Sequence, residues 1–140
     1  MILNFEYELE NAVIPYLIDK GYKLSQQVPL SNRLIDLAAI DDNDFLVCIE
    51  FKLNNWRKAL EQASKNKNSF DYVYICLPNK KFSKSLLQEA KKMGVGIIIY
   101  NAIERFLSIK LDAKKNQSQW IPNKNYIRNY ILNRDISWVN

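Results

Sequence analysis

The sequence contains no histidine among its 140 residues. This excludes Ser-His-Asp triads, Cys-His pairs, histidine-metal nucleases and most zinc sites, because each of them needs an imidazole. Only three glycines are present, and none of them forms a phosphate-binding loop of the Walker or dinucleotide type. The side chains left for chemistry are Asp, Glu, Lys, Arg, Tyr and Ser, with or without a hard metal ion.

Long hydrophobic runs and cysteine pairs are also scarce. No apolar run approaches the length of a membrane span, and the first ten residues are acidic and show no secretory signal. The two cysteines, Cys48 and Cys76, lie in apolar, strand-like runs, which favours buried thiols over a disulfide. We therefore expect a cytoplasmic protein without a membrane partner, of a size that suits one domain with a hydrophobic core.

Charge is unevenly distributed along the chain. Residues 1–52 hold 4 basic and 9 acidic residues, whereas residues 53–140 hold 16 basic and 6 acidic ones, within a net charge of +5. An acidic region inside a basic protein is typical of a metal site that also holds a polyanion. A high lysine content can arise without a polyanionic partner, so the charge alone does not establish such a site.

The spacing of apolar residues predicts an α/β fold. Helices are expected over residues 4–20, 56–63, 83–93 and 123–132, capped where visible by Asn4, by Asn54 or Asn55, and by Ser83; strands are expected over residues 22–28, 33–40, 45–52, 71–77, 95–100 and 106–112. This order indicates a mixed central sheet, in which a three-strand antiparallel meander is followed by parallel strand-helix-strand units, with helices on both faces. The last strand alternates apolar and polar residues, which predicts one wet face. We expect residues 1–112 to form the core domain and residues 113–140 a C-terminal extension, whose short helix packs on the core or forms a dimer contact.

Charged residues interrupt two of these strands. Asp36 lies in the first, and Glu50 and Lys52 lie in the second, where alternation puts both on the face of Cys48. If residues 42–44 form a three-residue loop, counting outwards places Asp36 opposite Glu50, with Lys52 one pleat away. A four-residue loop would instead turn Asp36 and Glu50 to different faces, so the turn length decides whether they meet.

Two neighbouring carboxylates repel each other, and burial increases the cost. A divalent ion resolves this, and Mg²⁺ or Mn²⁺ suits oxygen ligands. The carbonyl of Phe51 could supply a third oxygen, and Lys52 would then lie beside the metal-bound water. The simpler interpretation is a hairpin with one solvated face, and a Glu-x-Lys tripeptide alone would favour it.

The segments "R-L-I-D-L" at 33–37 and "I-E-F-K" at 49–52 resemble the motifs of the PD-(D/E)XK nuclease superfamily, which has the restriction-endonuclease-like fold. The resemblance covers roughly residues 5–100 and is greatest to small resolvase-type or uncharacterised defence-type members. It departs from the pattern at Ile35, where the name-giving motif has a proline.

The resemblance implies a role for each matching residue. Asp36 and Glu50 would be the acidic metal ligands, and Lys52 the catalytic lysine. A glutamate on the first helix often aids the metal site in this family. Glu10 matches it, with Glu6 as the other choice, and Gln62 matches a glutamine found after the lysine in many members.

A nuclease also needs contacts to phosphate. The candidate residues are basic and follow the motif or flank it: Arg33, Arg57, Lys58, Lys80 and Lys81. The leading hypothesis is a Mg²⁺-dependent deoxyribonuclease in which activated water attacks phosphorus, and a homodimer is compatible with it because one site cuts one strand. The alternatives are a catalytically inactive nuclease-fold module that binds DNA and an assembly or regulatory protein. The sequence leaves open the form of the nucleic acid, including RNA.

Overall fold

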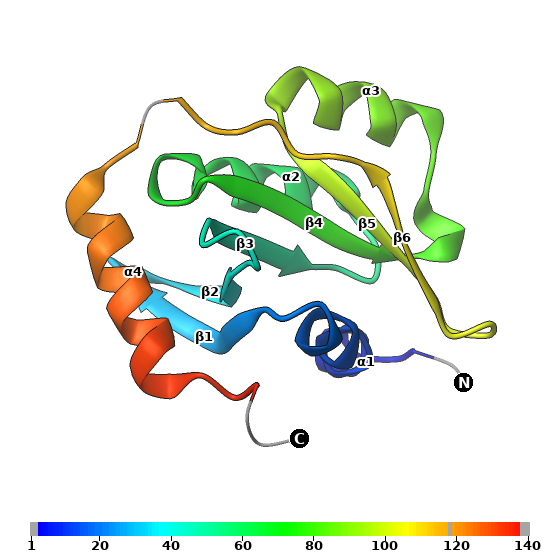
Figure 1. Cartoon of the computed structure of the whole chain (residues 1–140). Helices are drawn as coiled ribbons and strands as arrows, with labels where there is room; N and C mark the ends of the chain where they lie inside the picture. The colour runs from blue at the N-terminus through cyan, green and yellow to red at the C-terminus, as the bar shows by residue number, and fades with distance from the viewer. Residues whose placement is uncertain (1–2, 118, 138–140) are drawn as a thin grey trace.

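The computed structural model of the chain describes residues 3–117 and 119–137. It contains one six-stranded sheet flanked by four α-helices (Figure 1). The strands are β1 (Lys23–Leu30), β2 (Arg33–Ile40), β3 (Leu46–Phe51), β4 (Tyr72–Pro78), β5 (Gly96–Asn101) and β6 (Phe106–Leu111). The helices are α1 (Glu6–Asp19), α2 (Trp56–Ser64), α3 (Lys84–Met93) and α4 (Ile121–Arg134), with short 3₁₀ turns η1 (Lys67–Ser69) and η2 (Asn79–Lys81).

The strands lie side by side in the order in which the chain forms them. β1, β2 and β3 form an antiparallel meander, β3, β4 and β5 are parallel, and β6 returns antiparallel to β5. Helices α2 and α3 make the two crossovers between the parallel strands. The predicted mixed α/β architecture is therefore confirmed.

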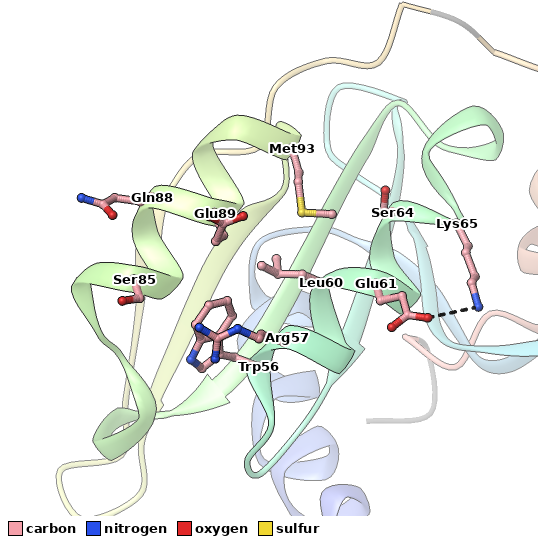
Figure 2. Close-up of a pocket in the computed structure, with 10 residues that line it drawn as sticks. All are labelled: Trp56, Arg57, Leu60, Glu61, Ser64, Lys65, Ser85, Gln88, Glu89 and Met93. Carbon is pink, nitrogen blue, oxygen red and sulfur yellow. Dashed lines mark ion pairs between the residues drawn. The ribbon is translucent and has the colours of Figure 1, made fainter.

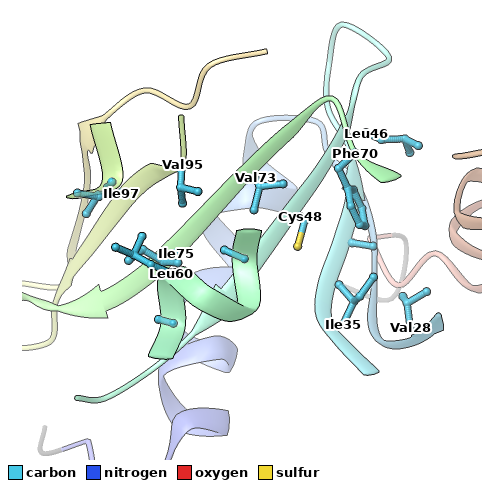
Figure 3. Packing of buried hydrophobic residues seen from close by; sticks show 14 of the residues in the cluster. Val28, Ile35, Leu46, Cys48, Leu60, Phe70, Val73, Ile75, Val95 and Ile97 are labelled. Atoms are coloured by element: carbon cyan, nitrogen blue, oxygen red, sulfur yellow. The ribbon is translucent and has the colours of Figure 1, made fainter. Parts of the chain in front are cut away.

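Two hydrophobic layers lie on opposite faces of the sheet. On one face α1 packs through Leu9 and Val13 against strand residues such as Val47 and Ile49. On the other face α2, α3 and α4 share one cluster with the alternate strand residues, among them Cys48 (Figure 3). Both cysteines are buried and unpaired, as expected. Among the described residues, no helix has both the length and the apolar character that a membrane crossing requires.

The helix ends follow local chemistry. The side chain of Asn55 accepts a hydrogen bond at the start of α2, and Ser83 accepts one from Leu86 N–H at the start of α3. Asn4 is not the N-cap of α1, contrary to expectation. Glu8 accepts hydrogen bonds from the backbone N–H groups of Asn4 and Phe5 at 3.0 and 2.9 Å, and the helix begins only at Glu6.

The predicted wet face of β6 is only partly correct. A β-bulge between Ile97 and Ile98 shifts the register with β6. Leu107 consequently packs on the α1 side of the sheet, while Leu111 packs on the opposite side. Ile109 lies between them and is 44% exposed. One step on β5, from Ile97 to Ile98, is matched by two steps on β6, from Leu111 to Ile109, so the extra residue lies in β6 and breaks the regular alternation that the sequence suggested.

The C-terminal helix α4 is longer than expected and packs on the sheet, mainly over β1 and β2. Ile127 and Ile131 are completely buried in the core cluster. Trp138, which belongs to the same tail, lies outside the described residues.

Candidate active site

The hairpin between β2 and β3 has the three-residue loop that the placement of the carboxylates requires. The N–H of Asp41 donates to the carbonyl of Phe45 at 2.9 Å, and Ala38 pairs with Cys48. Asp44 closes the loop in the left-handed region, with φ of 69°. This register puts Asp36 opposite Glu50, as predicted.

The carboxylates of Asp36 and Glu50 take over where the backbone ladder stops. The last regular pair is Leu37 with Ile49. Beyond it, the N–H of Asp36 donates to Glu50 Oε2 at 3.0 Å, and the N–H of Phe51 donates to Asp36 Oδ2 at 2.9 Å. Side-chain oxygens thus replace carbonyl oxygens as the acceptors, and each strand holds the carboxylate of the other.

Glu50 is also reached by an amide from the far side. Glu50 is only 5% exposed and Asn66 is 1% exposed. The side-chain amide of Asn66 donates a hydrogen bond to Glu50 Oε1 at 3.4 Å. Arg33 in turn donates to Asn66 Oδ1 at 2.8 Å and to the carbonyl of Lys65 at 3.0 Å. Asn66 was not predicted, since an asparagine just after a helix is typical of an exposed turn. The sequence predicted Gln62 for the site, and this residue lies half-buried on α2. Among the described residues, however, the side-chain amide that donates to Glu50 is that of Asn66.

Burial makes the charged form of Glu50 costly. Desolvation, and then the negative charge of Asp36, raise the pKa of Glu50 to about 8, and hydrogen bonds from the Asp36 backbone and Asn66 offset part of the shift. At neutral pH the pair therefore holds a proton unless a cation compensates the second charge.

Glu10 approaches Asp36 from α1. It is 4% exposed, and Gln26 Nε2 donates to its Oε1 at 3.0 Å. Burial raises the pKa of Glu10 to about 7, against the lowering effect of Gln26, and the charge of Asp36 raises it further. Within residues 3–117 and 119–137, however, no three carboxylate or thiol groups converge tightly enough to hold an ion by themselves. The ligand role of Glu10 stays a prediction.

Lys52 lies just beyond the end of β3, where strand alternation no longer applies. Its ammonium is 3.6 Å from Glu6 Oε2. Glu6 and Glu10 are four residues apart and so lie on the same face of α1. Both glutamates considered from the sequence therefore have partners in this region: Glu6 with the lysine, and Glu10 with Gln26.

The carbonyl of Phe51 is directed toward the same place. The N–H of Phe51 faces Asp36, and that of Lys52 bonds the carbonyl of Cys76 in β4. Because backbone groups of successive strand residues alternate in direction, the carbonyl of Phe51 faces the β2 side with its N–H. Its oxygen adds a third donor next to the carboxylate pair.

The predicted phosphate contacts lie in three places. Arg33 adjoins the carboxylate pair through Asn66. Arg57 and Lys58 begin α2, with the guanidinium of Arg57 4.2 Å from the ring of Trp56. Lys80 and Lys81 line a cavity of about 690 Å³ beyond the carboxyl ends of β4 and β5.

No protein-family model and no curated protein matches the sequence. Solved structures do share its fold. A protein of unknown function from Silicibacter pomeroyi superposes with a TM-score of 0.73 at 16% identity, over 95% of this chain and 87% of that chain. A repair endonuclease from Pyrococcus abyssi superposes with a TM-score of 0.54 at 17% identity, over 72% of this chain and 49% of that chain. EndoMS in its complex with double-stranded DNA superposes with a TM-score of 0.52 at 15% identity, over 72% of this chain and 47% of that chain.

At these identities the likeness shows the fold alone, and this chain spans about half the length of the two endonuclease chains. The mixed sheet, the helices on its two faces and the neighbours together identify a restriction-endonuclease-like α/β fold.

Proposed function

We propose that the protein is a metal-dependent nuclease that hydrolyses phosphodiester bonds in DNA. The observation that carries the proposal is the Asp36–Glu50 pair, held by reciprocal backbone hydrogen bonds at the end of the β2–β3 ladder. Structural neighbours that are endonucleases, one of them bound to DNA, support the same activity for this fold.

The donor set fits Mg²⁺ or Mn²⁺. All three groups, the carboxylates of Asp36 and Glu50 and the carbonyl of Phe51, offer hard oxygens, and Mg²⁺ commonly keeps several waters and needs few protein ligands. When bound, such an ion would make a water nucleophilic and balance charge on the phosphate. The raised pKa of Glu50 supports this assignment, because a cation relieves the cost that burial imposes.

The chain's own residues would position the reactants. Lys52 Nζ, 3.6 Å from Glu6 Oε2, would orient the attacking water or balance the charge that develops on phosphorus. Glu10 would complete the acidic wall from α1. The bond from the water oxygen to phosphorus would form and the bond from phosphorus to the 3′ oxygen would break, while the proton that the water loses passes through solvent to the leaving 3′ oxygen.

The second candidate is a nuclease-fold module that binds DNA without cutting it. Its support is that the backbone N–H groups of Asp36 and Phe51 already occupy one oxygen of each carboxylate. Such a module would bind DNA equally well when Asp36 is replaced, and would show no affinity for Mn²⁺.

Cleavage assays separate the two candidates. Plasmid and end-labelled single-stranded, duplex and branched DNA are incubated with Mg²⁺ or Mn²⁺. Asp36→Asn, Glu50→Gln and Lys52→Met should each lower the rate at least about a hundredfold, while Asp42→Asn, at an exposed position in the loop, should cut like the wild type. Circular dichroism checks the fold. A wild-type protein that cuts none of these substrates would rule out the enzyme.

A further inference from the structure

A groove runs between α2 and α3 on the outer face of the helical layer. Its cavity of about 720 Å³ has an apolar floor that includes Trp56, Leu60 and Met93, and polar walls that include Ser64 and Ser85 (Figure 2). Two carboxylates also line it, and both are already balanced. Glu61 lies 3.8 Å from Lys65, and Glu89 lies 3.5 Å from Lys92. The groove is thus nearly neutral and partly apolar.

A second cavity of about 630 Å³ continues from its end and has the opposite character. The two cavities share Ser64, Lys65 and Met93. Among the described residues, six lysines and no carboxylate line the second one: Lys65, Lys67, Lys91, Lys92, Lys114 and Lys115.

Helix dipoles account for only part of this charge. Lys91 and Lys92 lie in the last turn of α3, where cations are favourable, and Lys67 donates to the carbonyl of Met93 at that end. Lys114 and Lys115 come from the segment between β6 and α4, so their charges do not serve to balance the dipole of a helix to which they belong. Two of the six lysines already pair with the carboxylates of the first groove. The other four have no carboxylate partner among the described residues, and their mutual repulsion is relieved best by a ligand with several negative charges.

The lysine cavity also adjoins the proposed nuclease site. The carbonyl of Lys65 accepts a hydrogen bond from Arg33, and Arg33 bonds Asn66, which bonds Glu50. A chain of three hydrogen bonds therefore links the wall of the cavity to the carboxylate pair.

We infer that the α2–α3 groove and the lysine cavity together bind one single strand of nucleic acid, with bases on the apolar floor and phosphates on the lysines. A neutral groove with an aromatic residue that opens into a basic one matches what an unpaired strand offers, because its bases are free to leave the stack. A duplex keeps its bases stacked inside and would meet only the rim. The choice of nucleic acid as the polyanion rests on the proposed function.

Binding is measured by fluorescence anisotropy with labelled oligothymidylate and a duplex of equal length, without divalent ions. The wild type should prefer the single strand. Lys91→Gln/Lys114→Gln should weaken single-strand binding on the order of tenfold at low salt and reduce the slope of log affinity against log salt by about 1.4. Lys20→Gln/Lys23→Gln, which removes the same charge from exposed positions at the C-cap of α1 and at the start of β1, should have little effect.

A second variant tests the groove without removing lysines. Ser85 is exposed in the first turn of α3, where a carboxylate favours the helix, so Ser85→Glu should fold normally yet weaken single-strand binding. Equal losses in the Lys20/Lys23 variant, tighter binding of the duplex, or binding of inorganic polyphosphate but not of oligothymidylate would overturn the inference.

Failure of the inference can be told apart from failure of the proposed function. If Asp36→Asn binds the single strand but the wild type cuts nothing, the groove stands and the nuclease fails. If the wild type cuts DNA and the Lys91/Lys114 variant binds and cuts like it, the nuclease stands and the groove fails.

Discussion

The backbone N–H of Asp36 donates to the carboxylate of Glu50 across 3.0 Å, at the point where the ladder between β2 and β3 ends. The carboxylate of Asp36 accepts in turn from the N–H of Phe51. Two acidic side chains are thereby held against each other, with Glu50 buried and Asp36 half-buried. An energetic cost of this kind has a measurable dependence on pH and on cations.

The metal-free protein should lose stability as the pH rises from 5 to 8.5. The pKa values of Glu10 and Glu50 are raised to about 7 and about 8 in the folded state, so between pH 4.5 and 8 the folded state binds more protons than the unfolded one. Their stabilising effect is complete below the unfolded pKa and is lost as the pH rises through the folded values. Urea unfolding in EDTA should show a decrease of several kcal/mol, because each unit of pKa shift corresponds to about 1.4 kcal/mol.

The absence of histidine makes this experiment unusually clean, because no imidazole titrates in the same range. Glu50→Gln should remove the part of the slope that Glu50 contributes and leave the part due to Glu10, whereas Glu61→Gln, at an exposed residue on α2, should leave the slope unchanged. A slope of undiminished size in Glu50→Gln would show that the raised pKa belongs to other groups.

Mn²⁺ should stabilise the protein and should do so more strongly at pH 8 than at pH 6. Binding displaces the proton that Glu50 retains, so affinity rises with pH and protons are released. At a concentration of one hundred times Kd the gain would be about 2.7 kcal/mol. Calorimetric titration in two buffers of different ionisation enthalpy measures the affinity for Mn²⁺ and the number of protons released. Asp36→Asn should abolish the heat of binding. Retained binding in that variant would place the ion elsewhere.

The carboxylate pair could be predicted from the sequence because it depends only on the turn and on strand alternation. Three loop residues, closed by Asp44 in a left-handed conformation, set the register, and counting in twos then brings Asp36 to Glu50. Lys52 could not be placed this way, because β3 ends at Phe51 and the lysine turns to Glu6 on α1.

Asn66 was beyond reach for a different reason. Its contact with Glu50 joins residues 16 apart, and it depends on where α2 ends and on how η1 folds back over β3. Similarly, the bulge between Ile97 and Ile98 leaves no mark in the apolar pattern of β6. Local periodicity determines which face a side chain takes, whereas such contacts depend on the packing of whole elements.

Asn66→Ala should lower the free energy of unfolding by about 2 kcal/mol, because it leaves Arg33 Nε without its acceptor and Glu50 Oε1 without its amide. Arg33→Gln should cost less, since Arg33 is only half-buried. A double-mutant cycle should give a coupling of about 0.5–3 kcal/mol, as is usual for residues in one hydrogen-bond network. Additive losses would mean that the two residues act independently.

Helix α4 is joined to the sheet by two ion pairs that should differ greatly in strength. Lys124 Nζ lies 2.8 Å from Asp71 Oδ1, and Asp71 also accepts from the backbone N–H of Leu46. Lys124→Met should cost about 3 kcal/mol, because it leaves a buried carboxylate without its cation. Arg128 pairs with Asp44, which is exposed, so Arg128→Gln should cost less than about 1 kcal/mol.

Acid should remove the difference in stability between the wild type and Lys124→Met. Burial alone would raise the pKa of Asp71, but hydrogen bonds from Lys124, Leu46 and Gln119 outweigh it and hold the pKa below its ordinary value of 3.8. The stability that this lowered pKa contributes is present above pH 3.8 and is lost as the pH falls through the folded value. Urea unfolding of wild type and Lys124→Met should therefore converge in strong acid. Curves that stay parallel would show that Lys124 acts through packing of its aliphatic stem and not through its charge.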